Sequence, residues 1–201
     1  MTAGTRRLGA QGSGQRLLLM DATEQILCSE GYAGISARNV AERAGLTKQL
    51  FFYYFKSMDD LFLAVLRRIH ERRLERFEAA LRSDAPLRAL WALNTDPSGA
   101  ALATELTAIA SHREAVRAEI VQSAQQFRAL QVCALATLLP AQDHAAGLVM
   151  IAAALAKTLT AEAALGLTEG HAEALTLVER MLGELDAQTP QPPPLGQSRE
   201  V

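Results

Sequence analysis

The sequence predicts an all-α protein with a small N-terminal domain of three helices and a larger helical domain behind it. Apolar residues recur at helical spacing along most of the chain, and no stretch alternates β-branched and polar residues as a strand would. Hydrophobic residues make up 49% of the 201 residues and charged residues 21%, a balance typical of a globular chain with a buried core. Short segments bounded by capping residues and glycines mark the N-terminal domain.

Three helices are predicted before residue 57. Apolar residues at helical spacing predict the first helix over residues 14–30, and Gly31 follows where a C-cap is expected. Ser36 is predicted to cap a second, short helix, and Thr47 a third. Gly45 breaks the chain between these two short helices. This order of elements is that of a helix-turn-helix preceded by a supporting helix.

A long helix is predicted from Ser57, its N-cap, to about Leu81. One side of it carries an apolar stripe, and the other carries arginines interleaved with glutamates. The arginines are Arg67, Arg68, Arg72, Arg73 and Arg76, and the glutamates are Glu71, Glu75 and Glu78. Because these charges alternate at helical spacing, we predict an exposed face of ion pairs along the helix.

The whole chain is predicted to have four parts. A flexible basic arm covers residues 1–13, the helix-turn-helix domain covers 14–58, a helical domain covers 59–187, and a disordered proline-rich tail covers 188–201. Everything in the third part is predicted to be helical. Breaks between its helices are expected near residues 83–86, 94–99, 111–112, 140–141 and 165–168.

Several classes of protein are disfavoured by what the sequence contains. Two distant cysteines indicate a reducing compartment, and the N-terminus lacks the apolar core of a signal peptide, so we expect a cytoplasmic protein. The most apolar stretch, residues 145–156, is too short to span a bilayer. The four histidines are scattered, and no metal, nucleotide or nucleophile motif occurs. We therefore expect no enzyme activity, no cofactor and no metal site.

Charge is divided unevenly along the chain. Residues 1–82 hold 13 lysines and arginines against 9 acidic residues, whereas residues 83–201 hold 7 against 13. A basic front on an acidic body suits an anionic polymer at one end. A helix-turn-helix places its second helix in the major groove, where each base pair has a distinct pattern of donors and acceptors. The outer faces of the two short helices need hydrogen-bond donors, which are supplied by Ser36, Arg38, Thr47, Lys48 and Gln49.

Residues 31–57, GYAGISARNVAERAGLTKQLFFYYFKS, resemble the N-terminal domain of the tetracycline-repressor (TetR) family. Three parts of this run carry the resemblance at the expected spacing. They are the entry G-(Y/F)-x-x-(T/I)-(S/T), the turn (I/V)-A-x-x-A-G-(V/L)-(S/T) and the exit Y-Y-F-K-S. The match extends over about residues 15–63, and the remainder of the chain resembles the family only in length and helical character.

The resemblance implies a set of DNA contacts. Base contacts are implied for Lys48 and Gln49, a DNA contact for Arg38, and phosphate or other backbone contacts for Ser36, Thr47, Tyr53, Tyr54 and Lys56. All of these except Thr47 have a plainer alternative. Ser36 would then be a helix cap alone, the tyrosines would be packing residues at the rim of the core, and the other residues would be ordinary surface residues: Arg38, Lys48, Gln49 and Lys56.

This chain departs from the family pattern at three places. Phe52 stands where tyrosine is common, which removes a hydroxyl donor, and Met58 stands where lysine is common, which removes a phosphate partner. Gln49 and Leu50 replace smaller residues. These differences predict an altered set of DNA contacts and an altered operator, with no effect on the fold.

The last two helices, about residues 142–166 and 168–187, are candidates for a dimer interface. The resemblance implies that two such helices from each subunit form a four-helix interface; the alternative is that they bury their stripes within one chain. The candidate interface residues are Leu148, Ile151, Leu155, Leu159, Leu175, Val178 and Met181.

A ligand pocket is expected among the middle helices. Its candidate lining residues are Trp91, Leu106, Ile109, Phe127, Leu130 and Met150, although apolar residues at this spacing also suit plain core packing. The sequence thus predicts a homodimeric regulator that binds a palindromic DNA operator, most simply a repressor released by a small apolar ligand. Two alternatives stay open: a DNA-binding regulator without a small-molecule effector, and a helical binding module that does not act on DNA.

Overall fold

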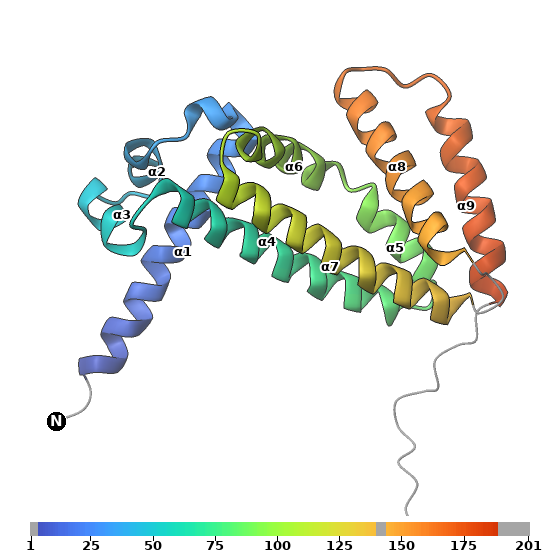
Figure 1. Cartoon of the computed structure of the whole chain (residues 1–201), viewed down its shortest axis with the longest axis horizontal. Coiled ribbons are helices and arrows are strands. Elements are labelled where there is room, and N and C mark those ends of the chain that lie inside the picture. The colour runs from blue at the N-terminus through green and yellow to red at the C-terminus, as the bar shows by residue number, and fades with distance from the viewer. Residues whose placement is uncertain (1–3, 140–143, 189–201) are drawn as a thin grey trace, which may run out of the picture. The chain divides into compact units, whose positions relative to one another are not determined.

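The computed structural model describes residues 4–139 and 144–188, and within these ranges the chain is helical and contains no strand (Figure 1). The all-α prediction is confirmed. The helices in chain order are α1 (Gly4–Glu30), η1 (Tyr32–Gly34, a 3-10 turn), α2 (Ala37–Arg43), α3 (Lys48–Tyr54), α4 (Met58–Leu81), α5 (Pro86–Asn94), α6 (Pro97–Ala110), α7 (Glu114–Leu138), α8 (Ala145–Ala164) and α9 (His171–Gln188).

The N-terminal helices begin at residues whose side chains cap a helix, and α1 ends at a glycine that adopts a left-handed conformation. Gly31 ends α1 with a φ of 68°, a left-handed conformation that glycine adopts without strain. The hydroxyls of Ser36, Thr47 and Ser57 each accept a hydrogen bond from the backbone N–H three residues ahead, over 3.1, 3.2 and 3.1 Å. These bonds satisfy donors that the first turn of a helix leaves unpaired.

Helix α1 starts earlier than the sequence pattern indicates. It begins at Gly4, so residues 4–13, which we predicted as part of a flexible arm, are helical (Figure 1). Once a helix exists, each further residue adds one hydrogen bond without repeating the cost of nucleation, which lets a helix extend through a glycine-containing stretch. The proline-rich segment 189–201, predicted to be disordered, lies outside the described residues.

Contacts within the chain group it into two compact units. Unit 1 consists of Met1–Arg72 and Ser98–Ala124, and unit 2 consists of Arg73–Pro97 and Gln125–Val201. Helices α4 and α7 therefore contribute residues to both units, and α6 belongs with the N-terminal helices. The domain boundary that we predicted after residue 58 does not coincide with this division. It separates the predicted DNA-binding segment from the rest of the chain, and it stays a prediction.

Two adjoining clusters form the core of unit 1. The first joins α1, α2, α3 and α4 and consists of Leu19, Met20, Ala22, Ile26, Val40, Ala41, Phe51, Phe55, Leu61 and Val65. The second joins α1, α4, α6 and α7 and consists of Leu27, Phe62, Leu66, Leu106, Ile109, Ala110 and Val116. Helices as short as α2 and α3 are not stable in isolation, so burial of their apolar sides in the first cluster holds them in place.

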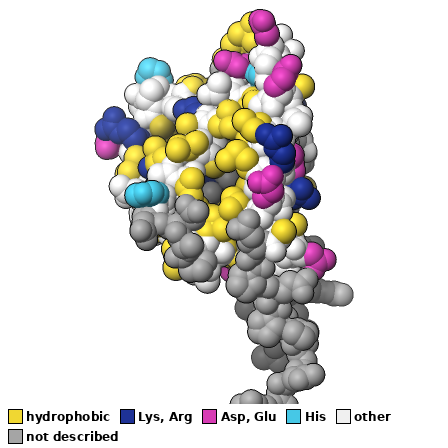
Figure 2. Space-filling model, turned by 90° about the vertical axis from the view of Figure 1, so that its right-hand side faces the viewer, with side chains coloured by type: hydrophobic (Ala, Val, Ile, Leu, Met, Phe, Trp, Pro, Cys, Tyr) yellow, Lys and Arg dark blue, Asp and Glu magenta, His cyan; other side chains and the backbone are white. Residues whose placement is uncertain are grey.

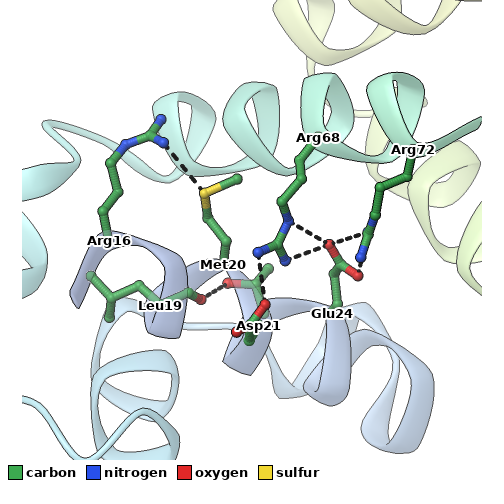
Figure 3. Close-up of polar contacts among 8 residues, drawn as sticks. Arg16, Leu19, Met20, Asp21, Glu24, Arg68 and Arg72 are labelled. Atoms are coloured by element: carbon green, nitrogen blue, oxygen red, sulfur yellow. Dashed lines mark hydrogen bonds and ion pairs between the residues drawn. The ribbon is translucent and has the colours of Figure 1, made fainter. Parts of the chain in front are cut away.

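The arginines of α4 reach other helices (Figure 3). Arg68 donates to Asp21 over 2.7 Å and to Glu24 over 2.6 Å, and Arg72 donates to both oxygens of Glu24 over 2.7 Å. These bonds tie α4 to α1. The predicted ion pairs of these arginines are present, but their partners lie on α1 and not on α4, because α1 brings carboxylates within reach that sequence spacing does not reveal.

Unit 2 packs α5 against α8 and α9. Trp91 of α5 lies with Ala156 and Leu159 of α8 in one buried cluster. The carboxylate of Asp186 on α9 accepts hydrogen bonds from the backbone N–H groups of Leu87 and Arg88, over 2.9 and 3.2 Å. A residue from the last helix thus caps the N-terminus of α5, where unpaired N–H groups and the helix dipole favour negative charge.

Candidate nucleic-acid interface

The turn between α2 and α3 has the geometry of a compact helix-turn-helix. Gly45 has a φ of 68°, and the backbone N–H of Leu46 donates to the carbonyl oxygen of Ala41 over 2.8 Å. Val40 and Phe51 are completely buried in the shared core on either side of the turn. The two helices are therefore fixed relative to each other by a tight turn and by packing at its base.

Helix α3 has one buried and one exposed side. Phe51 is buried, while Lys48, Gln49 and Tyr53 are exposed, with 78% of Tyr53 accessible. The ammonium group of Lys48 lies 5.9 Å from the ring centroid of Phe52. This distance is at the outer limit of a cation–π attraction, so the ring of Phe52 lies beside the predicted base-contacting lysine.

Tyr54 uses its hydroxyl within the protein. The Tyr54 hydroxyl donates to Gln15 Oε1 of α1 over 2.9 Å, and the Tyr54 ring meets that of Tyr53 edge to face at 4.9 Å. A tyrosine has a single hydroxyl proton, so the same group contacts a phosphate only by giving up Gln15. Tyr53 is the more accessible of the two phosphate candidates. Sequence spacing does not predict this hydrogen bond, because Gln15 and Tyr54 are 39 positions apart.

The remaining predicted contacts lie on the surface of unit 1. Arg38 on α2 is exposed and forms an ion pair with Glu42 one turn away, with 2.7 Å between Nε and Oε1. The hydrogen bond and the charge of Glu42 raise the pKa of Arg38, which keeps its guanidinium charged. Lys56 is exposed in the turn after α3, and Ser36 is half-buried while its hydroxyl caps α2.

Sequence reasoning missed a set of contacts around Tyr32, which precedes α2. Its backbone N–H donates to Glu105 Oε2 of α6 over 2.7 Å. Its hydroxyl accepts a hydrogen bond from Arg113 Nε, at the start of α7, over 3.3 Å. Arg113 also forms an ion pair with Asp59 at the start of α4. The hydrogen bond to Tyr32 is the largest cause that raises the pKa of Arg113.

The six residues predicted to line a ligand pocket have different surroundings. Leu106 and Ile109 are buried in the second cluster of unit 1, and Trp91 is buried in the cluster of unit 2. Phe127 packs edge to face on Phe77, with 5.2 Å between ring centroids. The other two residues, Leu130 and Met150, are exposed on the single chain.

The seven residues predicted for a dimer interface fall into two groups. Leu155, Leu159 and Val178 pack in or against the Trp91 cluster, within the chain. Leu148, Ile151, Leu175 and Met181 are exposed, with 67% of Ile151 and 53% of Met181 accessible. Figure 2, which faces the side of the chain formed by α8 and α9, shows hydrophobic side chains gathered there.

Helix α8 is both long and strongly apolar. Among the described residues it is the one helix whose length and composition would allow it to cross a membrane, with a mean hydropathy of 1.4 over 18 residues. A single helix of this kind is weak evidence for a membrane protein, because helices in cores and interfaces of soluble proteins have the same properties. In residues 4–139 and 144–188 no three His, Cys, Asp or Glu side chains gather as metal ligands would.

Comparison with known proteins identifies the N-terminal domain. Residues 19–65 match the model of the bacterial regulatory proteins, tetR family. This segment contains residues 19–30 of α1, then α2, the turn, α3 and the first part of α4. A comparison with curated proteins finds no match.

Solved structures share the fold over most of the chain. A TetR transcription regulator from Haloarcula marismortui has a TM-score of 0.69 at 20% identity, over 88% of this chain and 98% of that chain. A TetR-family transcriptional regulator from Rhodococcus sp. has a TM-score of 0.67 at 18% identity, over 89% of this chain and 100% of that chain. A transcriptional regulator from Saccharomonospora viridis in complex with choline has a TM-score of 0.70 at 18% identity, over 87% and 95%. The N-terminal segment thus matches the tetR-family model, and most of the chain shares the all-helical fold of these solved regulators.

Proposed function

We propose that this protein is a transcriptional repressor that binds a palindromic operator as a homodimer and leaves it when a small, mainly apolar ligand binds. The observation that carries the proposal is the arrangement of α3. Its apolar residue Phe51 is fixed in the core, while Lys48 and Gln49 at its N-terminal end are exposed. This is what a recognition helix needs to enter a major groove from a rigid base.

The chemistry of the exposed side chains suits both kinds of DNA contact. Lysine pairs well with the O6 and N7 acceptors of guanine, and glutamine with N6 and N7 of adenine. Ser36, Arg38, Thr47, Tyr53, Tyr54 and Lys56 would position the protein on the phosphates, and these contacts carry no sequence information directly. The basic front and acidic body favour approach of DNA to this end of the chain.

The exposed apolar residues of α8 and α9 support a homodimer. Leu148, Ile151, Leu175 and Met181 leave an apolar face that a second copy would cover, which also accounts for the hydropathy of α8 without a membrane. An isologous dimer has two-fold symmetry, and a palindromic operator has the same symmetry. A dimer of this kind would act in the cytoplasm, where DNA is accessible.

The experiment that tests DNA recognition is selection from a pool of random duplexes by the purified full-length protein at moderate salt. We expect a palindrome whose half-sites are about one helical turn apart. Weak, salt-sensitive binding without a preferred sequence would overturn the proposal, because electrostatic attraction alone produces that result. A variant with Lys48 and Gln49 both changed to alanine should recover a more degenerate sequence.

The effector is tested separately by thermal unfolding with a panel of small molecules. A ligand that binds the folded protein must raise its melting temperature, by mass action. The panel should include organic cations beside neutral apolar compounds. Arg73 lies 3.8 Å above the ring of Phe127, so this ring already faces a cation, and a regulator of similar fold was solved with choline. A ligand that raises the melting temperature but leaves operator binding unchanged would favour a regulator controlled in another way.

A further inference from the structure

Tyr32 of η1 is held at its backbone by Glu105 of α6 and at its hydroxyl by Arg113, the residue that precedes α7. Glu105 accepts from its backbone N–H over 2.7 Å, and Arg113 donates to its hydroxyl over 3.3 Å. Its ring lies 6.3 Å from that of Phe62 and packs against the second core cluster of unit 1. We refer to Tyr32, Glu105 and Arg113 together as the Tyr32 clamp. All three belong to unit 1.

Gly31 permits the close approach of Glu105. Its φ of 68° is in the left-handed region, and a Cβ at this position would lie 3.1 Å from Glu105 Oε2. Any larger residue would therefore strain the backbone and crowd the carboxylate. The bond from a backbone N–H to a carboxylate is a charge-assisted hydrogen bond, which is stronger than a bond between neutral groups.

The clamp lies immediately before the helix-turn-helix. The carbonyl oxygen of Tyr32 accepts from the N–H of Ile35 over 3.1 Å, and the next residue, Ser36, caps α2. Three residues therefore separate the clamped tyrosine from the cap that begins α2. The opposite end of the clamp, at Glu105 and Arg113, is the corner between α6 and α7, and α7 continues from there into unit 2.

We propose that Glu105 and Arg113 are positioning residues for DNA binding: by holding Tyr32 they set the orientation of α2 and α3 relative to α6 and α7. This inference rests on the proposed binding of an operator by a homodimer. In such a dimer the distance between the two recognition helices depends on how each helix-turn-helix is oriented on its own subunit. The clamp therefore determines which separation of operator half-sites the dimer accepts.

The internal packing of the helix-turn-helix does not depend on the clamp. Val40, Ala41 and Phe51 are buried in the first cluster together with residues of α1 and α4. Loss of the Glu105 bond leaves this cluster intact, so α2 and α3 remain folded and keep their own DNA contacts. The second cluster still packs α1 and α4 against α6 and α7, so the link that is lost is the direct one between the segment before α2 and α6. The orientation of α2 and α3 becomes less restricted to that extent, and the expected result is a change in spacing preference with little change in base preference.

The test uses the full-length protein and the selected operator, with the half-site separation increased and decreased by one or two base pairs. Binding is measured by fluorescence anisotropy. We expect the wild-type protein to prefer one separation. For Glu105→Ala, binding to that operator should weaken about tenfold, on the scale of one hydrogen bond to a charged group, and discrimination between separations should fall. Glu105→Gln keeps an acceptor for the Tyr32 N–H and should lose less affinity and less discrimination than Glu105→Ala.

The matched control is Glu119→Gln. Glu119 on α7 pairs with the exposed Arg67 of α4 over 3.0 Å, so this change also removes a carboxylate from unit 1 but does not contact Tyr32. The control should bind every operator as the wild type does. Tyr32→Phe removes only the hydroxyl bond to Arg113 and should have a smaller effect than Glu105→Ala.

Amide hydrogen exchange reports on the clamp without DNA. Exchange at the Tyr32 amide should accelerate in Glu105→Ala and not in Glu119→Gln, with the interior of α1 unchanged. If exchange accelerates but all separations weaken by the same factor, the residue is merely structural and the inference is wrong. If the wild-type protein prefers a palindrome and Glu105→Ala keeps the same spacing preference, the inference fails while the proposed function stands. If the wild-type protein selects no duplex, both fail.

Discussion

The helix-turn-helix and the α8–α9 pair expose opposite kinds of surface. In α2 and α3 the apolar residues Val40 and Phe51 are completely buried, and polar and charged side chains face outward. In α8 and α9 only part of the apolar set is buried, and Leu148, Ile151, Leu175 and Met181 remain exposed. Both regions consist of amphipathic helices. In the first, the chain itself buries the apolar sides of the helices, and in the second it leaves part of them exposed.

The difference supports the partner that we propose for each surface. Exposed donors on a rigid helix suit base edges and phosphates, which reward direction and charge. Burial of an exposed apolar face lowers the free energy and does not depend on the direction of the partner's groups, so this face suits a second copy of the same surface. Changes at the first surface should therefore alter specificity, and changes at the second should alter assembly.

The largest effect is expected from the buried side of α3. Phe51→Ala should lower the free energy of unfolding by about 3–5 kcal/mol, because it removes a fully buried ring and leaves a cavity. Phe52→Ala, at a neighbouring position where 48% of the side chain is exposed, should cost less than about 1 kcal/mol. Urea unfolding measures both. Equal losses for the two variants would mean that α3 presents a different side to the core.

The next largest effect concerns the apolar face of α8. Ile151→Asp should weaken self-association by roughly a hundredfold, because an interface centre tolerates a desolvated charge poorly. Sedimentation velocity over a range of concentrations measures the monomer–dimer equilibrium. Lys157→Glu, at an exposed and already charged position on the same helix, is the control and should leave the dimer intact. A fully dimeric Ile151→Asp protein would place the interface elsewhere.

A smaller effect separates the two kinds of contact on α3. Gln49→Ala should reduce discrimination at one base pair of each half-site by about 1–3 kcal/mol, since a base contact carries sequence information. Tyr53→Phe should weaken binding to all operator sequences by a similar factor, since a phosphate contact does not. Affinities for a set of single-base operator variants distinguish these outcomes. An unchanged base preference in Gln49→Ala would show that Gln49 does not contact a base in the major groove.

The smallest effect is expected at Arg38. Its ion pair with Glu42 is exposed and local, so Arg38→Ala should leave thermal stability unchanged within error. If Arg38 contacts a phosphate, the slope of log affinity against log salt concentration should fall in magnitude by about 0.9, the contribution of one phosphate. Titration at several salt concentrations measures this slope. An unchanged slope would leave Arg38 as a solvated residue paired with Glu42.

Much of the N-terminal domain was predictable because local residues determine it. Ser36, Thr47 and Ser57 cap the helices for which they were predicted, since a cap needs only a hydroxyl and an N–H three residues away. Gly31 and Gly45 take the positive φ values that end α1 and form the turn. The helix-turn-helix follows from such short-range preferences together with helical periodicity.

Contacts between distant residues were not predictable in the same way. The partners of Arg68 are Asp21 and Glu24 of α1, although Glu71 and Glu75 are closer in sequence. The hydroxyl of Tyr54 is bound to Gln15, and the N–H of Tyr32 to Glu105, which is 73 residues away. Such pairs depend on the distance and rotation between helices, and no periodicity within one helix contains that information.

The sequence by itself determined the helical class, the helix-turn-helix and the residues that α3 exposes, because capping, turn geometry and periodicity are local properties. Only the tertiary structure decided which apolar residues of α8 and α9 stay exposed. Leu155 and Leu159 of α8 pack in or against the Trp91 cluster, whereas Leu148 and Ile151 share that helix and its periodicity but remain accessible. A stripe on a helix becomes core or interface according to which neighbour reaches it, and that is a property of the packed chain.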